Sequence, residues 1–119
     1  MSKQQTGTQG ERIAVEYLRR KDYAIIETNW HCTRGELDII AREGDVLVFV
    51  EVRTRRAANT EDALVSITPR KRDRLIAAAH SYIAEHELEN CDWRIDVVAV
   101  ALPRSGQPLI DHVEDALGW

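Results

Sequence analysis

Apolar and polar residues recur along the chain with two different periods, which predict two long helices and several strands. Over residues 8–21 the apolar side chains have helical spacing, and Thr8 and Glu11 have the identities and spacing of a capping box. A second and more regular helical pattern follows Thr68, a good N-cap residue, and Pro69, which fits the first helical position. We therefore expect one helix near the N-terminus and another in the second half of the chain.

Extended segments lie between the two predicted helices and after the second one. Five segments have strand character: residues 23–28, 36–41, 46–52, 93–102 and 109–113. The cluster Glu43-Gly44-Asp45 predicts a hairpin turn between the second and third segments, and the polar residues 54–61 predict a loop. This order predicts an α/β fold with a mixed central β-sheet flanked by helices, in a single domain over residues 1–119.

Two carboxylates interrupt the hydrophobic pattern of the predicted hairpin. Asp38 lies in its first strand, and Glu51, followed by Arg53, lies in its second. Side chains alternate between faces along a strand, and the second strand is apolar on both faces, so we expect it to be central and covered on both sides. A two-residue turn or a four-residue loop puts Asp38 on the face of Glu51 and Arg53, and a turn at Gly44-Asp45 puts it directly opposite Glu51. An odd-length loop separates them.

The first predicted helix adds a third carboxylate, because Glu11 falls within the arc of apolar residues that faces the sheet. Two unit charges about 4 Å apart cost roughly 4 kcal/mol at an effective dielectric near 20, so such a cluster must be protonated, paired with a cation or bound to metal. Several oxygen ligands at short range suit Mg²⁺ or Mn²⁺. The competing interpretation is a buried ion pair of Arg53 with Glu51 or Asp38, with Glu11 only capping its helix.

Composition and charge narrow the class of protein. The formal net charge of −4 argues against a protein that coats nucleic acid non-specifically. Cys32 and Cys91 match neither a disulfide framework nor a zinc site, and we expect two reduced core thiols. The chain shows neither a signal peptide nor a run of about 20 apolar residues, which predicts a cytoplasmic protein that does not enter a membrane.

The order of acidic residues resembles a known nuclease motif. An acid in one strand, a turn and Glu-Val-Arg in the next strand are similar to the PD-(D/E)XK motif, with 12 residues between Asp38 and Glu51-Val52-Arg53. The blocks GERIAVEYL, RGELDIIA, VFVEVRTR, PRKRDRL and WRIDVVAV, in this order, resemble the YraN family of bacterial proteins over nearly the whole chain. The resemblance implies a restriction-endonuclease-like fold, with Glu11 placed like the helix glutamate of archaeal Holliday-junction resolvases.

The resemblance also implies an activity and roles for individual residues. It implies an endonuclease that uses Mg²⁺ or Mn²⁺ and acts on DNA, with branched or structured DNA as the expected form. Asp38 and Glu51 would hold the metal with the Val52 carbonyl, and Glu11 would be a further ligand or would orient water at the metal. Arg53 departs from the motif, which has lysine there. Because arginine stays protonated, Arg53 would hold the phosphate or offset charge rather than act as a base.

Basic residues in two places are candidates for contact with nucleic acid. Arg55 and Arg56 directly follow the strand of Glu51. Arg70, Lys71 and Arg72 lie in the first turn of the second helix, where a phosphate would offset their repulsion with the helix dipole. The alternative for both groups is that they are solvated surface charges.

Two further acids are open to more than one interpretation, and three hypotheses about function follow. Glu36 is either a carboxylate behind the ligands or a residue at the rim, and Asp96 is expected to pair with Arg94 or Arg74. The first hypothesis is a metal-dependent endonuclease, a homodimer by analogy with junction resolvases. The second, favoured by Arg53 and the acidic net charge, is a non-catalytic nucleic-acid-binding or protein-interaction module that keeps the nuclease fold. The third is a structural domain with a buried ion pair.

Overall fold

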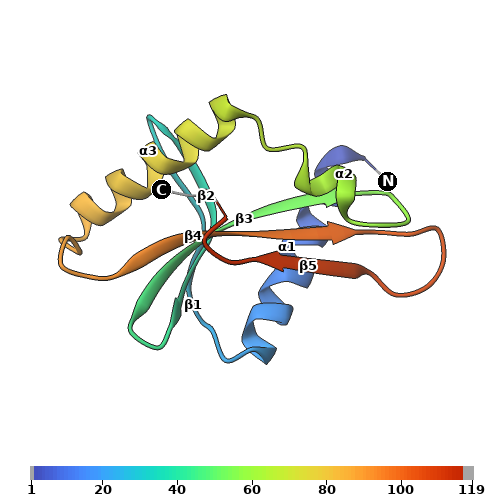
Figure 1. The fold of residues 1–119 in the computed structure, drawn as a ribbon, viewed down its shortest axis with the longest axis horizontal. Helices are drawn as coiled ribbons and strands as arrows, with labels where there is room; N and C mark the ends of the chain where they lie inside the picture. The colour runs from blue at the N-terminus through green and yellow to red at the C-terminus, as the bar shows by residue number, and fades with distance from the viewer. Residues whose placement is uncertain (1, 117–119) are drawn as a thin grey trace.

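A mixed five-stranded β-sheet with helices on both faces forms the body of the molecule in the computed structural model, which describes residues 2–116 (Figure 1). The elements are α1 (Lys3–Arg20), β1 (Ala24–Cys32), β2 (Gly35–Glu43), β3 (Val46–Arg55), α2 (Glu61–Leu64), α3 (Pro69–Glu85), β4 (Trp93–Ala101) and β5 (Leu109–Val113). The strand order is β1-β2-β3-β4-β5, with neighbours antiparallel except for β3 and β4, which are parallel. The predicted α/β fold is confirmed and is consistent with a restriction-endonuclease-like architecture.

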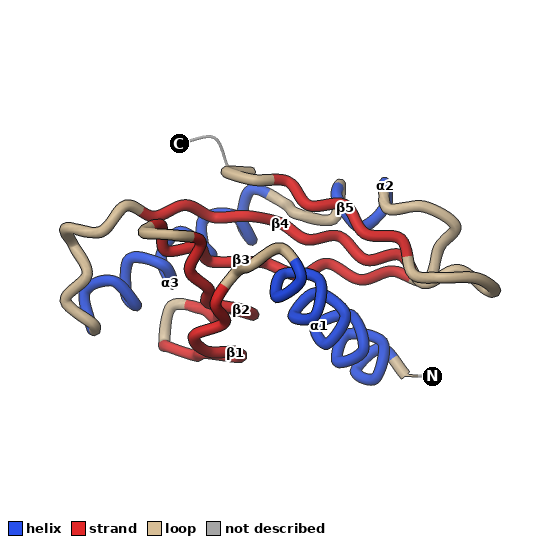
Figure 2. The backbone as a smooth tube through the Cα atoms, turned by 90° about the horizontal axis from the view of Figure 1, so that it is seen from below, coloured by secondary structure: helices blue, strands red, loops and turns tan. Residues whose placement is uncertain are grey.

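The strands are apolar on both faces because α1 and α3 cover opposite faces of the sheet (Figure 2). On β3, Val48 and Val50 pack with Leu18 of α1. The alternate residues of β3, Leu47 and Phe49, pack in the cluster that contains the buried stripe of α3. This two-sided cover confirms the central position predicted for β3, and it removes the middle of the strand from water.

The hairpin between β2 and β3 has the turn that its sequence predicts. Glu43 pairs with Val46, so the turn consists of Gly44 and Asp45. Gly44 has a φ of +58°, a conformation that glycine adopts without steric cost. The turn is therefore of the even length that brings Asp38 toward Glu51.

Helix α1 begins earlier than predicted. Ser2 is its N-cap, and Ser2 and Gln5 form the capping box. Thr8 lies inside the helix, where its hydroxyl donates a hydrogen bond to the Gln4 carbonyl at 3.0 Å. The prediction that Thr8 caps the helix with Glu11 as its partner is wrong, because Ser2 offers the same cap chemistry one and a half turns earlier. Glu11 consequently lies well inside the helix and does not cap it.

The other element boundaries agree with the prediction in most places. Thr68 caps α3 by accepting a hydrogen bond from the Lys71 backbone N–H at 3.2 Å, and Pro69 is the first helical residue. Strand β1 continues to Cys32, beyond the predicted end, and the predicted loop contains the short helix α2. None of the helices in the described part of the chain has both the length and the apolar character of a membrane span.

The sheet forks where the carboxylates lie. The ladder between β2 and β3 ends at the pair Ile39–Val50, whereas β3 stays paired with β4 as far as Arg55. In Figure 1 the connection between β1 and β2 rises beside α3, while β3 runs in another direction. Beyond the last pair the two strands diverge, and Asp38 and Glu51 are the first residues on either side of the opening.

Candidate functional site

Asp38 and Glu51 occupy the opening of the fork. The Asp38 carboxylate accepts a hydrogen bond from the Val52 backbone N–H at 2.8 Å, so a side chain of β2 bridges to β3 just past the end of the ladder. The Glu51 side chain is 12% exposed, and its Oε2 lies 3.7 Å from Nη1 of Arg53, which is 16% exposed. Two carboxyl groups and one guanidinium therefore share a recess at the end of the paired region.

The charge of Glu51 is poorly compensated. The pKa of Glu51 is raised to about 9, first by burial and then by the neighbouring Asp38, through a hydrogen bond and through its negative charge. Arg53 lowers the pKa but does not offset these effects, because its guanidinium is at the long end of ion-pair distance. Its surroundings therefore disfavour the ionised form of Glu51, and a cation placed between the two carboxyl groups would favour it.

Glu11 faces the same opening from α1, as the helical pattern predicts. Burial raises the pKa of Glu11, and the negative charge of Asp38 adds to the rise. A hydrogen bond with Asn29 opposes it, and Glu36 adds a further, smaller increase. Asn29 was not anticipated from the sequence. It has a φ of +55° in the middle of β1, and asparagine is among the residues that tolerate this conformation.

Strand alternation breaks at Asp38. Leu37 packs on the α3 side and Ile39 on the α1 side, although residues two apart in a regular strand share a face. At the same place, the ladder between β1 and β2 leaves out Asn29 and Asp38, although the residues on either side of them are paired. The predicted turn and register are therefore confirmed, but Asp38 shares a face with Glu51 only in part: its carboxylate reaches across the fork instead of standing above the sheet.

Arg53 is held by a residue that the sequence did not single out. Its Nε donates a hydrogen bond to Ser66 Oγ at 2.8 Å, and Ser66 Oγ donates to the Ala63 carbonyl at 2.6 Å. Ser66 lies in the connection between α2 and α3, and its contact with β3 spans 13 residues of sequence. Arg53 does form the ion pair with Glu51 that the competing interpretation, a purely structural ion pair, requires. This pair does not bring the pKa of Glu51 back to its ordinary value.

Two pockets meet at this cluster. The pocket on the α3 side, of about 330 Å³, and the pocket on the α1 side, of about 570 Å³, share the lining residues Glu36, Glu51 and Arg53. The α1-side pocket also contains Glu11 and Asp38. Glu36 lies at the rim, where it forms an exposed pair with His31 at 2.9 Å. The site is therefore a recess with an approach from either face of the sheet.

The basic residues predicted from the sequence divide between this recess and other surfaces. Three of them line the two pockets: Arg55, Arg56 and Lys71. Arg72 instead lines a separate, mostly apolar pocket of about 430 Å³, and Arg70 is exposed and lines neither pocket of the recess. Lys3 and Arg74 line the recess but were missed. Lys3 could not be identified because it precedes the predicted start of its helix. Arg74 could have been identified, because it follows Lys71 by three residues and therefore lies on the same helix face.

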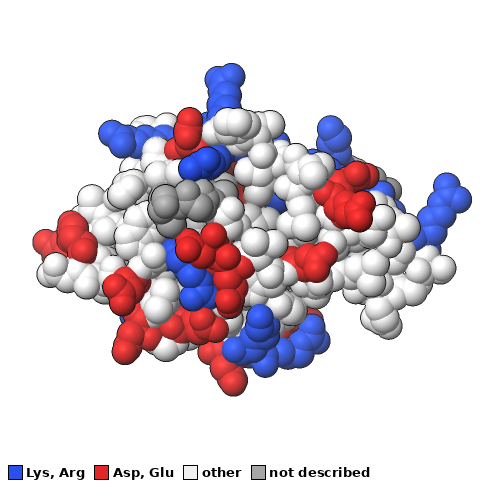
Figure 3. Space-filling view, in the orientation of Figure 1, with Lys and Arg blue, Asp and Glu red and all other residues white. Residues whose placement is uncertain are grey.

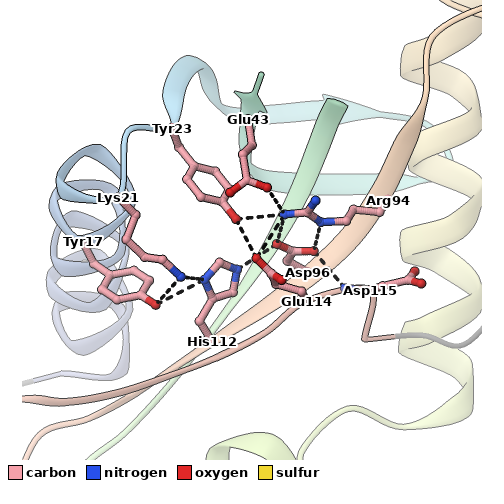
Figure 4. Close-up of polar contacts among 9 residues, drawn as sticks. All are labelled: Tyr17, Lys21, Tyr23, Glu43, Arg94, Asp96, His112, Glu114 and Asp115. Carbon is pink, nitrogen blue, oxygen red and sulfur yellow. Dashed lines mark hydrogen bonds and ion pairs between the residues drawn. The ribbon is translucent and has the colours of Figure 1, made fainter. Parts of the chain in front are cut away.

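A second charged cluster lies on the α1 face, around the fully buried Asp96 (Figure 4). Its carboxylate accepts hydrogen bonds from Arg94 Nε at 2.9 Å and from the Asp115 backbone N–H at 3.0 Å, and it lies 2.7 Å from Nε2 of His112. Burial alone would raise the pKa of Asp96, but the hydrogen bonds from His112, Arg94 and Asp115 together lower it. Arg94 is one of the two partners predicted for Asp96. The contact with His112 carried no signal in the sequence.

This second cluster has the spacing of a metal site but already contains its own cations. Among the described residues, the only three His, Cys, Asp or Glu side chains with ligand atoms within 4.8 Å of one another are Asp96, His112 and Glu114. Arg94 Nη2 lies 3.3 Å from Asp96 and 3.5 Å from Glu114, and Lys21 Nζ lies 3.3 Å from Nδ1 of His112. These contacts join α1, β4 and β5, and Arg94 balances part of the negative charge of the group.

Similarity to known sequences agrees with the order of motifs along the chain. The sequence profile of Uncharacterised protein family UPF0102 matches residues 10–100, a range that includes Glu11, Asp38, Glu51 and Arg53. A UPF0102 protein of Dehalococcoides mccartyi is 43% identical over 117 residues, which cover 98% of this chain and 96% of the relative.

Two further relatives extend the match to other bacteria. A UPF0102 protein of Chloroflexus aurantiacus is 47% identical over 118 residues, covering 98% and 95% of the two chains. A UPF0102 protein of Geotalea uraniireducens is 44% identical over 110 residues, covering 92% and 87%. The agreement in length and the profile match show that the chain belongs to Uncharacterised protein family UPF0102, the YraN family that its motifs resemble.

Proposed function

We propose that the chain is a divalent-metal-dependent endonuclease that hydrolyses phosphodiester bonds in DNA, with its site at the fork between β2 and β3. The observation that carries the proposal is the recess at the fork, where the carboxyl groups of Asp38 and Glu51 lie together and Arg53, 3.7 Å from Glu51, offsets their charge only in part. Burial and the neighbouring Asp38 raise the pKa of Glu51 accordingly. Carboxyl groups perturbed in this way within a cleft are typical of functional sites. The resemblance to junction resolvases adds branched DNA, and a homodimer, as forms to test.

The oxygen donors around the fork suit Mg²⁺ or Mn²⁺. Asp38 and Glu51 would hold the ion with the Val52 carbonyl, and Glu11 would approach from α1; all are hard oxygen donors of the kind these ions prefer. A divalent ion relieves the repulsion that raises the pKa values of Glu51 and Glu11. When bound there, it supplies Lewis-acid charge to a phosphate and makes water more acidic.

Arg53 has the role of a phosphate-binding cation in this proposal. Ser66 accepts a hydrogen bond from its Nε, which leaves the terminal nitrogens of the guanidinium on the side of Glu51 and the pockets. A guanidinium stays protonated and donates hydrogen bonds in a fixed fork that matches phosphate oxygens. Arg53 would thus orient the phosphate and offset the charge that develops during hydrolysis, while the proton acceptor is a carboxylate or water.

A second candidate function is the binding of nucleic acid without cleavage, and Arg53 is the residue that favours it. The nuclease motif has a lysine at this position, which can lose its proton, whereas arginine cannot. Binding needs only a positive charge at the recess, and Arg53 provides one. The two candidates therefore differ in whether the site promotes attack of water on the phosphodiester or only binds the nucleic acid.

Cleavage assays with matched variants test the proposal. Duplex, single-stranded and four-way-junction DNA are incubated with the protein and with Mg²⁺ or Mn²⁺. We expect metal-dependent cleavage of at least one of them, reduced by roughly 100-fold in Glu51→Gln and in Asp38→Asn, because each change removes a metal ligand. Glu11→Gln should reduce cleavage too, whereas Glu16→Gln on the opposite side of the same helix should not.

The result that contradicts the proposal is the absence of metal-dependent cleavage of all three DNA forms by wild-type protein. If DNA binding persists in that case, the non-catalytic function is the correct one. Thermal unfolding with and without Mn²⁺ gives an independent readout, since only a bound ion raises the melting temperature. We expect this rise in wild type and in Glu16→Gln, and its loss in Asp38→Asn and Glu51→Gln.

A further inference from the structure

The two pockets of the recess form one path that crosses the acidic cluster. They share Glu36, Glu51 and Arg53, and they open on opposite faces of the sheet because β2 and β3 diverge at this point. Beyond the shared residues, cations line both pockets, and the α1-side pocket also contains the acidic Glu11 and Asp38 of the central cluster. Lys71 and Arg74 of α3 line one pocket, and Lys3, Arg55 and Arg56 line the other.

The charge order along this path is therefore cationic, acidic with Arg53, and cationic again. A chain of phosphates laid along it would meet two cations on one side of Glu51 and three on the other. The five cations have no carboxylate within ion-pair distance in the described part of the chain, so their charge is available to a ligand. A polyanion that binds here would be held on both sides of the carboxyl groups.

The dimensions of the path favour a single strand over a duplex. Pockets of about 330 and 570 Å³ are in the range that small-molecule ligands occupy. Glu51 and Arg53, 12% and 16% exposed, lie at the bottom where the pockets meet. A duplex carries its phosphates on a stiff convex surface, whereas an unpaired strand bends and can lower one phosphate into a recess. The face in Figure 3 carries acidic and basic side chains in mixture.

We propose that the recess binds an unpaired nucleic-acid strand that runs from the α3-side pocket to the α1-side pocket, with one phosphate at Glu51 and Arg53 and its neighbours beside the cations on either side. The proposal rests on the proposed function in placing a phosphate at this site. Within residues 2–116, and apart from the exposed His31 ring, the lining of the two pockets provides no aromatic side chain for a base to stack on. Recognition therefore falls on the phosphates, and binding is independent of base sequence.

Two pairs of basic residues on the same helix test this path. Lys71 and Arg74 line the α3-side pocket, whereas Arg70 lies outside the recess and Arg72 lines the separate apolar pocket. All four side chains are exposed on the first turns of α3. The double variants Lys71→Ala/Arg74→Ala and Arg70→Ala/Arg72→Ala therefore remove the same charge from the same helix and differ only in the surface from which they remove it.

The experiment measures binding of a fluorescein-labelled 12-nucleotide single-stranded DNA by fluorescence anisotropy, in EDTA and at several NaCl concentrations. Arg53 and the five flanking cations make six phosphate contacts, which predict a slope of log affinity against log salt of about −4.2, since each contact on a single strand contributes about −0.7. Lys71→Ala/Arg74→Ala should reduce the slope by about 1.4 and weaken binding roughly 25-fold at 0.1 M salt. Arg70→Ala/Arg72→Ala should leave the affinity within about twofold of wild type.

Three outcomes would overturn the proposal. They are equal losses in the two double variants, tighter binding of the same sequence as a duplex than as a single strand, and no binding of the single strand at low salt. Because the measurement needs neither metal nor cleavage, it separates this proposal from the proposed function. Binding with the predicted slope and no nuclease activity leaves the strand path standing, whereas cleavage confined to fully paired duplex rejects the path and keeps the nuclease.

Discussion

Two clusters of charged side chains interrupt the hydrophobic strands, and they differ in how completely their charges are neutralised. Asp96 is fully buried, but hydrogen bonds from Arg94, His112 and the backbone lower its pKa. Glu51 is less buried, yet burial raises its pKa, Asp38 beside it adds to the rise, and Arg53, 3.7 Å away, offsets it only in part. Burial is therefore a poor guide to function here. The number and placement of hydrogen-bond donors separate a carboxylate that stabilises the fold from one that is available to a ligand.

The largest expected effect is on the neutralised cluster. Asp96→Ala should reduce the free energy of unfolding by about 3–5 kcal/mol, because it leaves Arg94 and His112 without their buried partner. Urea unfolding followed by circular dichroism measures the loss. The exposed Asp73 provides the control, and Asp73→Ala should change stability by about 0.5 kcal/mol or less. A loss below about 1 kcal/mol in Asp96→Ala would show that this network does not stabilise the fold.

A smaller effect is expected where α1 contacts the sheet, because this helix serves both clusters. A Cβ atom added at Gly10 would come within 1.8 Å of Thr54 Oγ1, so Gly10→Ala must push the helix away from β3. We expect a loss of about 1–3 kcal/mol in thermal or urea unfolding. At Gly7 nothing lies within 4 Å of an added Cβ, and Gly7→Ala should instead stabilise the helix by about 0.5–1 kcal/mol. Equal effects of the two changes would contradict the close packing at Gly10.

The third effect has the opposite sign and depends on pH. The folded pKa of Glu51 is raised above its ordinary value of 4.5, so folding favours the protonated carboxyl, and its contribution to stability is complete below pH 4.5 and declines as the pH rises toward 9. Glu51→Gln does not titrate and should lack this decline. We expect it to be more stable than wild type by about 0.5–2 kcal/mol at pH 8 and equal to it near pH 4.

Melting temperatures at pH 4, 6 and 8 measure this difference, and the two clusters should respond in opposite directions. The lowered pKa of Asp96 means that its contribution is present above its ordinary value of 3.8 and is lost only as the pH falls below it. Asp96→Asn should therefore keep the decline of stability between pH 5 and 8 that Glu51→Gln removes. A Glu51→Gln protein that is less stable than wild type at pH 8 would mean that Glu51 is a structural ion-pair partner of Arg53.

Much of the fold was predictable because its signals are local. The Gly44-Asp45 turn sets the parity of the hairpin, and the Thr68-Pro69 pair marks the start of α3. The start of α1 was missed for a reason of the same kind. Ser2 and Thr8 are both good N-cap residues, and local chemistry does not rank two caps that lie within reach of one helix.

The candidate site was predictable in its acidic residues, in Arg53 and in three of its flanking cations, but not in the residues that hold these side chains. Asp38, Glu51 and Glu11 follow from strand alternation, turn parity and helical spacing, all of which act over short stretches of chain. Ser66, which holds Arg53, and Asn29, which contacts Glu11, gave no such signal, because their partners lie 13 and 18 residues away along the chain.

The sequence by itself determined which residues alternate, where the hairpin turns and which carboxylates come to one end of it. Only the tertiary structure decided that the sheet forks at Asp38, that His112 meets Asp96, and that Lys71 and Arg74 face the recess while Arg72 does not. The physical reason is the range of the interactions. Turn, cap and periodicity are set by neighbours in sequence, whereas compensation of a buried charge depends on donors brought in by packing, and it is this compensation that distinguishes the two clusters.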